Sequence, residues 1–429
     1  MLVEFKFSNF RSFKEEAVFS MEPLSQNGSN PNTINTNLKK VPQLYRTAGI
    51  FGANASGKSN IMVAFGFLQF LVKQSAKSVV GDKFPSEFYA FADNASDKPI
   101  TLDIQFIVED NLYEYSVSIL HNIVQTENLY YYPISSEGSA KPNRIFERSN
   151  INGKIEFEKS KGILQSWSNE TLDNRLFLSE IVNNRKCTVK EILDAYNWII
   201  QTLSIRNTHS MNDSFSLTKI LEGNGADIVK LMKKADLGLE DISVTETSVE
   251  EIIAQKENLN DKAKLNLLSL LTRGKRKALE AKSFHKTEDG EIKSFDFNNM
   301  ESLGTKRFLA LSGYLLEAIK QGKVFIVDEL DDSLHPYLVK NLISLFNDPN
   351  INTNNAQLIF MSHAHYLMDG EHLSRDQIWL TSKELNKGFY SDLYSLSDFK
   401  NLNRKNAAFY NAYMEGIYGA VPFWERDNG

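Results

Sequence analysis

The sequence predicts an α/β fold that combines a mixed sheet, an antiparallel β lobe and an inserted helical subdomain. Three observations predict this fold: an apolar run at 47–51 leads through a glycine-rich loop into a helical pattern, paired runs of alternating apolar residues fill much of the first half, and a second apolar run at 323–327 ends in two acidic residues. We expect three parts in chain order: the first half of the main domain with the β lobe (1–173), a helical insertion (174–285) and the second half of the main domain (286–429).

The glycine-rich loop has the residue types that bind phosphate. The run Gly52-Ala53-Asn54-Ala55-Ser56-Gly57-Lys58-Ser59 matches the pattern G-x-x-x-x-G-K-[ST]. In this pattern backbone amides surround phosphate oxygens, the lysine places a cation beside the β and γ phosphates, and the serine hydroxyl ligates Mg²⁺. The sequence therefore predicts a P-loop NTPase in which a nucleoside triphosphate contacts Gly52, Asn54, Ser56, Gly57, Lys58, Ser59 and Asn60.

Composition narrows the class of protein. Hydrophobic residues make up 42 % of the chain, charged residues 24 %, and the formal net charge is −6, which argues against a generally basic nucleic-acid-binding surface. No apolar run approaches the roughly 18 residues of a membrane span, and the single cysteine, Cys187, excludes an internal disulfide. We expect a cytoplasmic protein with no membrane partner.

The first part reads as antiparallel β structure. Residues 1–20 alternate on both sides of a turn at Asn9–Phe13, residues 100–108 pair with 113–119, and a third hairpin turns at 152–153. In the first turn, Arg11 is either a solvated cation or a cation beside the nucleotide. Residues 25–37 are expected to form a loop. The aromatic pair Tyr113 and Tyr115 suits sheet packing better than base stacking.

Residues 174–285 change to a helical pattern. Helices are predicted over Val189–Ile205, Ala226–Ala235 and Val249–Ala281. The densest basic cluster of the chain, Arg273–Lys277, lies in this part. It reads as a solvated loop, with contact to nucleic-acid phosphates as the alternative.

The second half supplies acidic, histidine and serine residues at the ends of predicted elements. Asp328 and Glu329 follow the buried run, so Asp328 can hold Mg²⁺ and Glu329 can polarise the attacking water. His363 follows a further apolar run and could sense the γ phosphate. Upstream, Ser302, Gly304 and Thr305 open a helix, where amides and a hydroxyl favour a phosphate or form an N-cap.

The order of these motifs resembles the ATP-binding-cassette (ABC) ATPases of the SMC and Rad50 type. Asn9–Phe13, Asn54, Glu301–Thr305 and the C-terminal run Tyr413–Pro422 are similar, more narrowly, to the prokaryotic AAA15 ATPases of the RloA and AbiLi kind. Leu303 and Ala364 depart from the usual pattern, and no glutamine of the lobe-connecting loop can be placed.

This resemblance implies an ABC-type head that binds ATP and Mg²⁺, with Lys58, Glu329 and His363 as catalytic residues. It also implies head-to-head dimers in which Ser302 and Gly304 of one copy close on ATP held by the other, while Asp331 lies in the segment that crosses the interface. Many such ATPases act in phage defence with a separately encoded effector of nuclease, TOPRIM or RloB-like type.

Three functions remain open at this point. The first is an ATPase sensor that regulates a defence effector, the second a Rad50-like DNA-repair or DNA-end-processing ATPase, and the third a nucleotide-gated scaffold. The absence of a long heptad pattern counts against the second function, and Glu329 counts against the third. Higher assembly than a dimer and binding of DNA stay open.

Overall fold

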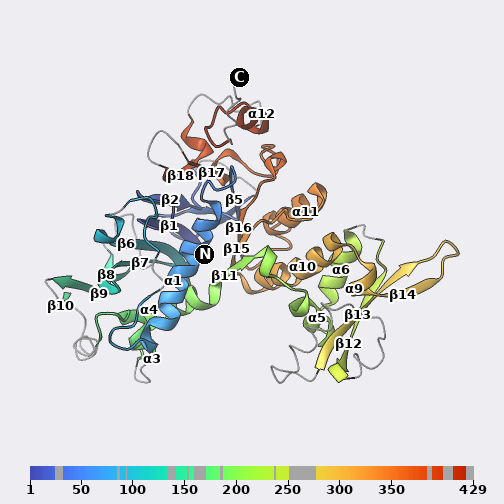
Figure 1. Cartoon of the computed structure of the whole chain (residues 1–429), viewed down its shortest axis with the longest axis horizontal. Helices are drawn as coiled ribbons and strands as arrows, with labels where there is room; N and C mark the ends of the chain where they lie inside the picture. Colours follow the sequence, from blue (N-terminus) through green and yellow to red (C-terminus); the bar gives the residue numbers. More distant parts are fainter. Residues whose placement is uncertain are drawn as a thin grey trace. The chain divides into compact units, whose positions relative to one another are not determined.

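The computed structural model divides the chain into two compact units (Figure 1). Unit 1 contains Met1–Asn207, Ala318–Asp331 and Val339–Gly429, and unit 2 contains Thr208–Glu317 and Asp332–Leu338. The structure describes residues 1–24, 32–84, 87–92, 94–132, 142–151, 154–158, 171–183, 187–235, 238–250, 277–383, 389–399 and 409–421.

The antiparallel lobe of unit 1 is a seven-stranded sheet, blue to teal in Figure 1. Its order is β10-β9-β8-β7-β6-β1-β2. The expected hairpins are confirmed, because β1 pairs with β2, β6 with β7 and β9 with β10. The strands are β1 (Leu2–Ser8), β2 (Ala17–Ser20), β6 (Ile100–Val108), β7 (Asn111–Leu120), β8 (Ile123–Tyr132), β9 (Asn143–Ile151) and β10 (Lys154–Glu158).

Two tyrosines of this lobe are buried in the packing of the sheet and are not exposed for stacking with nucleic-acid bases. Tyr113 and Tyr115 are buried, and the Tyr113 ring lies against Phe106 and Tyr131. The prediction of sheet packing for this pair is therefore confirmed.

The second sheet of unit 1 has six strands in the order β11-β15-β16-β5-β17-β18. All neighbouring pairs are parallel except β17 with β18. Strands β5, β15 and β16 are buried throughout, as expected for the centre of a parallel sheet. The strands are β5 (Thr47–Gly52), β11 (Leu203–Asn207), β15 (Val324–Asp328), β16 (Gln357–Met361), β17 (Ile378–Lys383) and β18 (Ser391–Ser395).

One helix of unit 1, α1 (Lys58–Gln74), packs against this sheet. Helix α1 contacts β5, β11 and β15, and it follows the glycine-rich loop as predicted.

A two-stranded sheet pairs β3 (Thr33–Asn35) with β4 (Gln43–Tyr45). The expectation of a loop over 25–37 is therefore wrong at Thr33–Asn35, and residues 25–31 lie outside the described residues. The remaining helices are α3 (Phe177–Asn183), α4 (Lys190–Asn197), a π-helix (Trp198–Thr202) and α12 (Phe409–Met414), with α11 (Pro336–Asn347) running from unit 2 into unit 1.

A buried ion pair ties β8 and β9 to the start of α3. The Arg148 guanidinium lies 3.4 Å from Glu127, and both side chains are fully buried. Glu127 also accepts hydrogen bonds from the amides of Phe177 and Leu178 and from the Tyr115 hydroxyl. These bonds satisfy a charge that would be costly to bury alone.

Unit 2 contains strands as well as helices. Helices α5 (Ser214–Leu221) and α6 (Ala226–Lys234) accompany a three-stranded antiparallel sheet of β12 (Asp241–Ser248), β13 (Lys277–Lys286) and β14 (Ile292–Asp296). Helix α9 (Phe297–Met300) follows, and α10 (Leu303–Gln321) begins in unit 2 and ends in unit 1.

Two of the helix predictions for residues 174–285 are therefore wrong in part. The predicted helix Val189–Ile205 ends at Thr202, because Leu203–Asn207 instead completes the edge of the parallel sheet beside β15. Lys277–Ala281 forms part of strand β13, while 251–276, including most of the basic cluster, lie outside the described residues. Helix α6 is confirmed. The boundaries at 173 and 285 stay a prediction.

Across the described residues, none of the helices is long and apolar enough to cross a membrane.

Candidate functional site

The glycine-rich loop connects the carboxyl end of β5 to the first residue of α1. Its two glycines leave no room for a side chain: a Cβ at Gly52 would collide with the backbone oxygen and hydroxyl of Thr381, and a Cβ at Gly57 would lie 2.5 Å from the Ser391 hydroxyl. Gly57 also has a φ of 117°, which L residues rarely adopt. Residues of β17 and β18 therefore lie so close to the loop that only glycine fits at both positions.

Lys58 is held inside the loop. Its side chain is buried, and its Nζ donates to the carbonyl oxygens of Gly52 at 2.7 Å and Ala53 at 3.0 Å. Burial lowers the pKa of Lys58 to about 8, although the nearby carboxylates of Asp328, Asp331 and Glu329 raise it. The ammonium is therefore the main form near neutral pH, and a phosphate anion would stabilise it.

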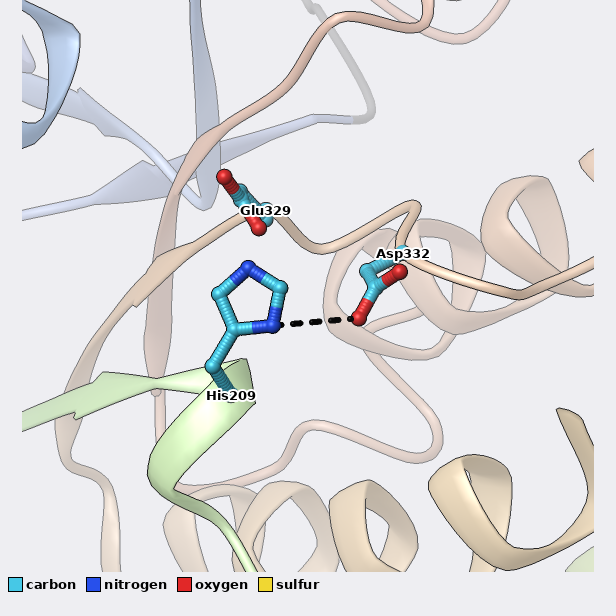
Figure 2. Close-up of side chains that lie close together, drawn as sticks. All are labelled: His209, Glu329 and Asp332. Atoms are coloured by element: carbon cyan, nitrogen blue, oxygen red, sulfur yellow. Dashed lines mark ion pairs between the residues drawn. The ribbon is translucent and has the colours of Figure 1, made fainter. Parts of the chain in front are cut away.

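Asp328 and Glu329 stand at the carboxyl end of β15. Asp328 is 2 % exposed, whereas Glu329 is partly exposed and follows the strand directly (Figure 2). Glu329 has a φ of 56°, in the left-handed region where a residue with a Cβ is strained. Backbone strain of this kind is characteristic of functional sites, where the direction of the side chain matters more than local stability.

The loop that carries His363 is fixed by its neighbours. The amide of Ser362 donates to Ile50 in β5 at 3.1 Å, and the Ser362 hydroxyl donates to Asp331 at 2.6 Å. Burial, followed by the positive charge of Lys58, lowers the pKa of His363. The imidazole is therefore neutral near pH 7 and can either donate or accept a hydrogen bond.

These elements meet at one cavity of about 1250 Å³ within unit 1. It lies where the carboxyl ends of parallel strands converge, which is the usual ligand position in such sheets. Of the residues expected at the nucleotide, the cavity is lined by Arg11, Asn54, Ser56, Gly57, Lys58, Ser59, Asn60, Asp328, Glu329 and His363. Gly52 and Asp331 are not among its lining residues; Gly52 supports Lys58, and Asp331 holds Ser362.

Four of the residues that line the cavity form two side-chain pairs, Arg11 with Glu87 and Lys383 with Phe91. Arg11 forms a bidentate ion pair with Glu87, at 2.5 and 2.7 Å, and its guanidinium also donates to Asn60 at 3.3 Å. The Lys383 ammonium lies 4.5 Å from the centre of the Phe91 ring, which is 55 % exposed. Arg11 thus lines the cavity and is paired with Glu87; its contact with a nucleotide stays a prediction.

The Ser302 motif lies in unit 2 and forms the start of α10. The Ser302 hydroxyl accepts from the Thr305 amide at 3.1 Å, so Ser302 has the geometry of an N-cap. A Cβ at Gly304 would lie 2.8 Å from the carbonyl oxygen of Ser333. Asp332 pairs with Arg307 at 3.3 Å and with His209 at 3.6 Å, the contact that Figure 2 marks.

Ser59 and Asp328 fit the expectation of a Mg²⁺ site. A hydroxyl and a carboxylate are hard oxygen ligands, and both line the cavity that contains Lys58. Magnesium typically takes only one or two protein ligands and completes its shell with water and substrate phosphates, so two such oxygens beside the phosphate loop suffice.

Comparison with known proteins identifies the family. A family model described as "AAA domain, putative AbiEii toxin, Type IV TA system" matches residues 48–369. The chain belongs to this AAA_21 family. Its AAA domain places it among the P-loop ATPases, and the matched range runs from β5 past the His363 loop. The finer resemblance to AAA15 ATPases stays a prediction. No curated protein matches the chain.

Two solved structures resemble this AAA_21 protein. One is titled "Crystal structure of the SmcHead bound to the C-winged helix domain of ScpA", with 15 % identity, a TM-score of 0.40, and coverage of 92 % of this chain and 97 % of the other. The second is the "SMC head domain from Thermotoga maritima", with 11 % identity, a TM-score of 0.41, and coverage of 92 % and 98 %.

Sequence reasoning missed the cavity residues Glu87, Phe88, Ala90, Phe91 and Lys383. Lys383 ends the apolar run of β17, so recognition of that run as another parallel strand would have placed it at the same edge. Glu87 and Phe91 belong to a segment without a motif, and only the folded chain brings them to Arg11 and Lys383.

Proposed function

We propose that the protein is a Mg²⁺-dependent ATPase whose ATP-driven dimerisation regulates a separately encoded effector in antiphage defence. The observation that carries the hydrolytic part is the convergence of Lys58, the Asp328–Glu329 pair and His363 on one cavity. This arrangement supplies a cation for the phosphates, oxygen ligands for a metal, a carboxylate base and a neutral imidazole.

Each of these residues has a distinct role in the proposal. Lys58 and the loop amides hold the phosphates, while Ser59 and Asp328 hold Mg²⁺, which would neutralise charge on the transferring phosphoryl group. Glu329 orients the attacking water and accepts its proton, and His363 donates a hydrogen bond to the γ phosphate. The bound base would stack on Phe91, whose ring is open to the cavity.

The regulatory part rests on the sequence resemblance and on the site. Ser302, Gly304 and Thr305 would complete the nucleotide site of a second copy, so ATP would control association. The family description names a putative toxin of a toxin–antitoxin system, which supports a role in defence. An effector of nuclease, TOPRIM or RloB-like type would then be the partner, and DNA contact stays open.

The Glu329→Gln variant tests the hydrolytic role. The amide keeps the size of the side chain but removes its basicity, so we expect phosphate release to fall by about 10²–10⁴-fold while ATP binding is retained. Steady-state phosphate release and equilibrium binding of ATP would measure the two effects.

The matched control is Glu288→Gln, the same change at an exposed position in unit 2. It should hydrolyse ATP like the wild type. Full turnover by Glu329→Gln would remove Glu329 from the role of base, and failure of the wild type to release phosphate from ATP would refute the proposal itself.

A further inference from the structure

The C-terminal run that the resemblance singled out has no role in the mechanism above. We define the C-terminal turn as residues 413–420, Tyr-Met-Glu-Gly-Ile-Tyr-Gly-Ala. It lies in unit 1 and beyond the family match, which ends at residue 369. The geometry points to Tyr413 as a positioning residue of the nucleotide site: its hydroxyl holds the Ala420 carbonyl, and that carbonyl fixes Ala53 of the phosphate loop.

The contact with the phosphate loop is made by backbone atoms. The Ala53 amide donates to the Ala420 carbonyl oxygen at 3.1 Å. The carbonyl of Ala53 accepts from the Lys58 ammonium at 3.0 Å and from the Ser56 amide at 3.3 Å. Ala53 therefore joins the C-terminal turn to the lysine that would bind the phosphates, and a shift of Ala420 would move this end of the loop.

Tyr413 controls where the Ala420 carbonyl lies. Its side chain is 1 % exposed, and its hydroxyl donates to that carbonyl at 3.0 Å. A carbonyl oxygen has two lone pairs, so the Tyr413 hydroxyl and the Ala53 amide can bind it together. Burial raises the pKa of Tyr413 to about 12, so the hydroxyl keeps its proton and remains a donor at physiological pH.

The turn needs a special backbone next to this carbonyl. Gly419 has a φ of 70°, in the left-handed region that favours glycine. A residue with a Cβ at this position would be strained, and the strain would be relieved by moving the neighbouring Ala420. The sequence Tyr-Gly-Ala therefore suits a turn that aims one carbonyl at the phosphate loop.

The ring of Tyr413 meets the other loop of the site. It packs against His365 with ring centres 4.9 Å apart, and His365 follows His363 by two residues. The amide of Tyr410 also donates to Met368 at 3.1 Å. The hydroxyl thus acts on the loop that would hold the α and β phosphates, while the ring packs beside the loop that would meet the γ phosphate.

This division gives a specific expectation, which rests on the proposed function. Loss of the hydroxyl alone should weaken the binding of both ADP and ATP, because both nucleotides carry phosphates that the loop holds. The rate at saturating ATP should change little, because Glu329 and the His363 loop keep their contacts.

The test compares Tyr413→Phe with Tyr418→Phe in the full-length protein. Tyr418 is also buried, and its hydroxyl has no hydrogen-bond partner within the described residues, so the second variant removes the same atom without removing that contact. We expect Tyr413→Phe to bind Mg·ADP about three- to tenfold more weakly, the effect of one lost neutral hydrogen bond, and to raise KM for ATP with kcat within about twofold. Tyr418→Phe should bind ADP like the wild type.

A second variant guards against a folding defect. Gly419→Ala leaves the Tyr413 side chain intact but strains the turn, so it should also weaken ADP binding, as Tyr413→Phe does. Melting temperatures would verify that all variants fold. Equal ADP affinity for both phenylalanine variants and the wild type would overturn the inference, as would a loss confined to kcat. If the wild type bound neither ADP nor ATP, the proposed function would fall as well, so the two failures are distinguishable.

Discussion

At the residue scale, we expect the charge state of Lys58 to decide how strongly the protein binds phosphate. Its pKa is lowered to about 8 in the free protein, chiefly by burial. A bound phosphate favours the ammonium and so raises the pKa of the complex above that of the free protein. Binding should therefore be strongest where Lys58 is already protonated, below about pH 8.

This reasoning predicts the pH dependence of nucleotide affinity. The dissociation constant of ADP should change little around pH 7 and should rise above about pH 8, by up to about tenfold per unit until the pKa of the complex is reached. Isothermal titration calorimetry at several pH values would measure it.

The control for this prediction is Lys58→Arg, because a guanidinium stays charged over the whole range. Its affinity should not share the alkaline loss, whatever its absolute value. A wild-type affinity that stays flat from about pH 7 to pH 9 would contradict the lowered pKa of Lys58.

The sequence predicted most residues that line the cavity, since they belong to motifs with a fixed spacing. It left Arg11 between two interpretations, and both stay predictions, although the fold adds that its guanidinium pairs with Glu87 and lines the cavity. That pair joins residues from the first turn and from the segment after α1, so no local pattern could have predicted it.

At the element scale, the β lobe depends on the buried pair of Arg148 and Glu127. Arg148 also donates to the carbonyl oxygen of Leu172 at 3.0 Å and to that of Arg175 at 2.5 Å. The Arg148 side chain thus connects β9, β8 and the residues before α3. We therefore expect the Arg148–Glu127 pair to stabilise the β lobe.

Arg148→Met should lower the free energy of unfolding by about 3–5 kcal/mol, because it leaves Glu127 charged and buried. Burial raises the pKa of Glu127 and Arg148 lowers it, so loss of Arg148 raises that pKa further. A group with a raised folded-state pKa is less destabilising at low pH, where it takes up a proton, so the loss should be smaller near pH 5 than near pH 8. Denaturant unfolding at both pH values would measure it.

The double variant Glu127→Gln/Arg148→Met is the matched control for this prediction. It removes both charges and should recover part of the lost stability. A single variant as stable as the wild type at about pH 8 would show that the pair does not stabilise the lobe.

Elements with a clear local pattern were predicted correctly: β5 and β15 from continuous apolar runs, and α1 from apolar residues at helical spacing. The first three residues of β11, Leu203–Ile205, were predicted as helix because an apolar pattern continues into them from α4. Their actual state follows from the free hydrogen-bonding edge of β15, which a local pattern does not contain.

At the scale of the whole molecule, the proposal requires two copies for one complete site. In that case Lys58 from one copy and Ser302 from the other serve the same ATP. We therefore expect Lys58→Ala and Ser302→Arg each to abolish hydrolysis when pure, with ATP binding retained by the second variant.

Mixing the two variants tests this arrangement. A mixed dimer contains one site with an intact phosphate loop and an intact Ser302 motif, so an equimolar mixture should recover phosphate release. Inactive mixtures of proteins that are shown to associate would refute a site shared between copies.

The sequence by itself determined which residue types are available at the proposed nucleotide site. Its motifs specify a phosphate loop, an acidic pair and a histidine, because each of these functions needs particular residue types at a short, fixed spacing. The tertiary structure alone decided which distant segments complete the site: Glu87 beside Arg11, Thr381 and Ser391 beside the loop glycines, and the C-terminal turn beside Ala53. These contacts join residues far apart in the chain, and they arise from strand pairing and turn geometry that only the folded chain defines.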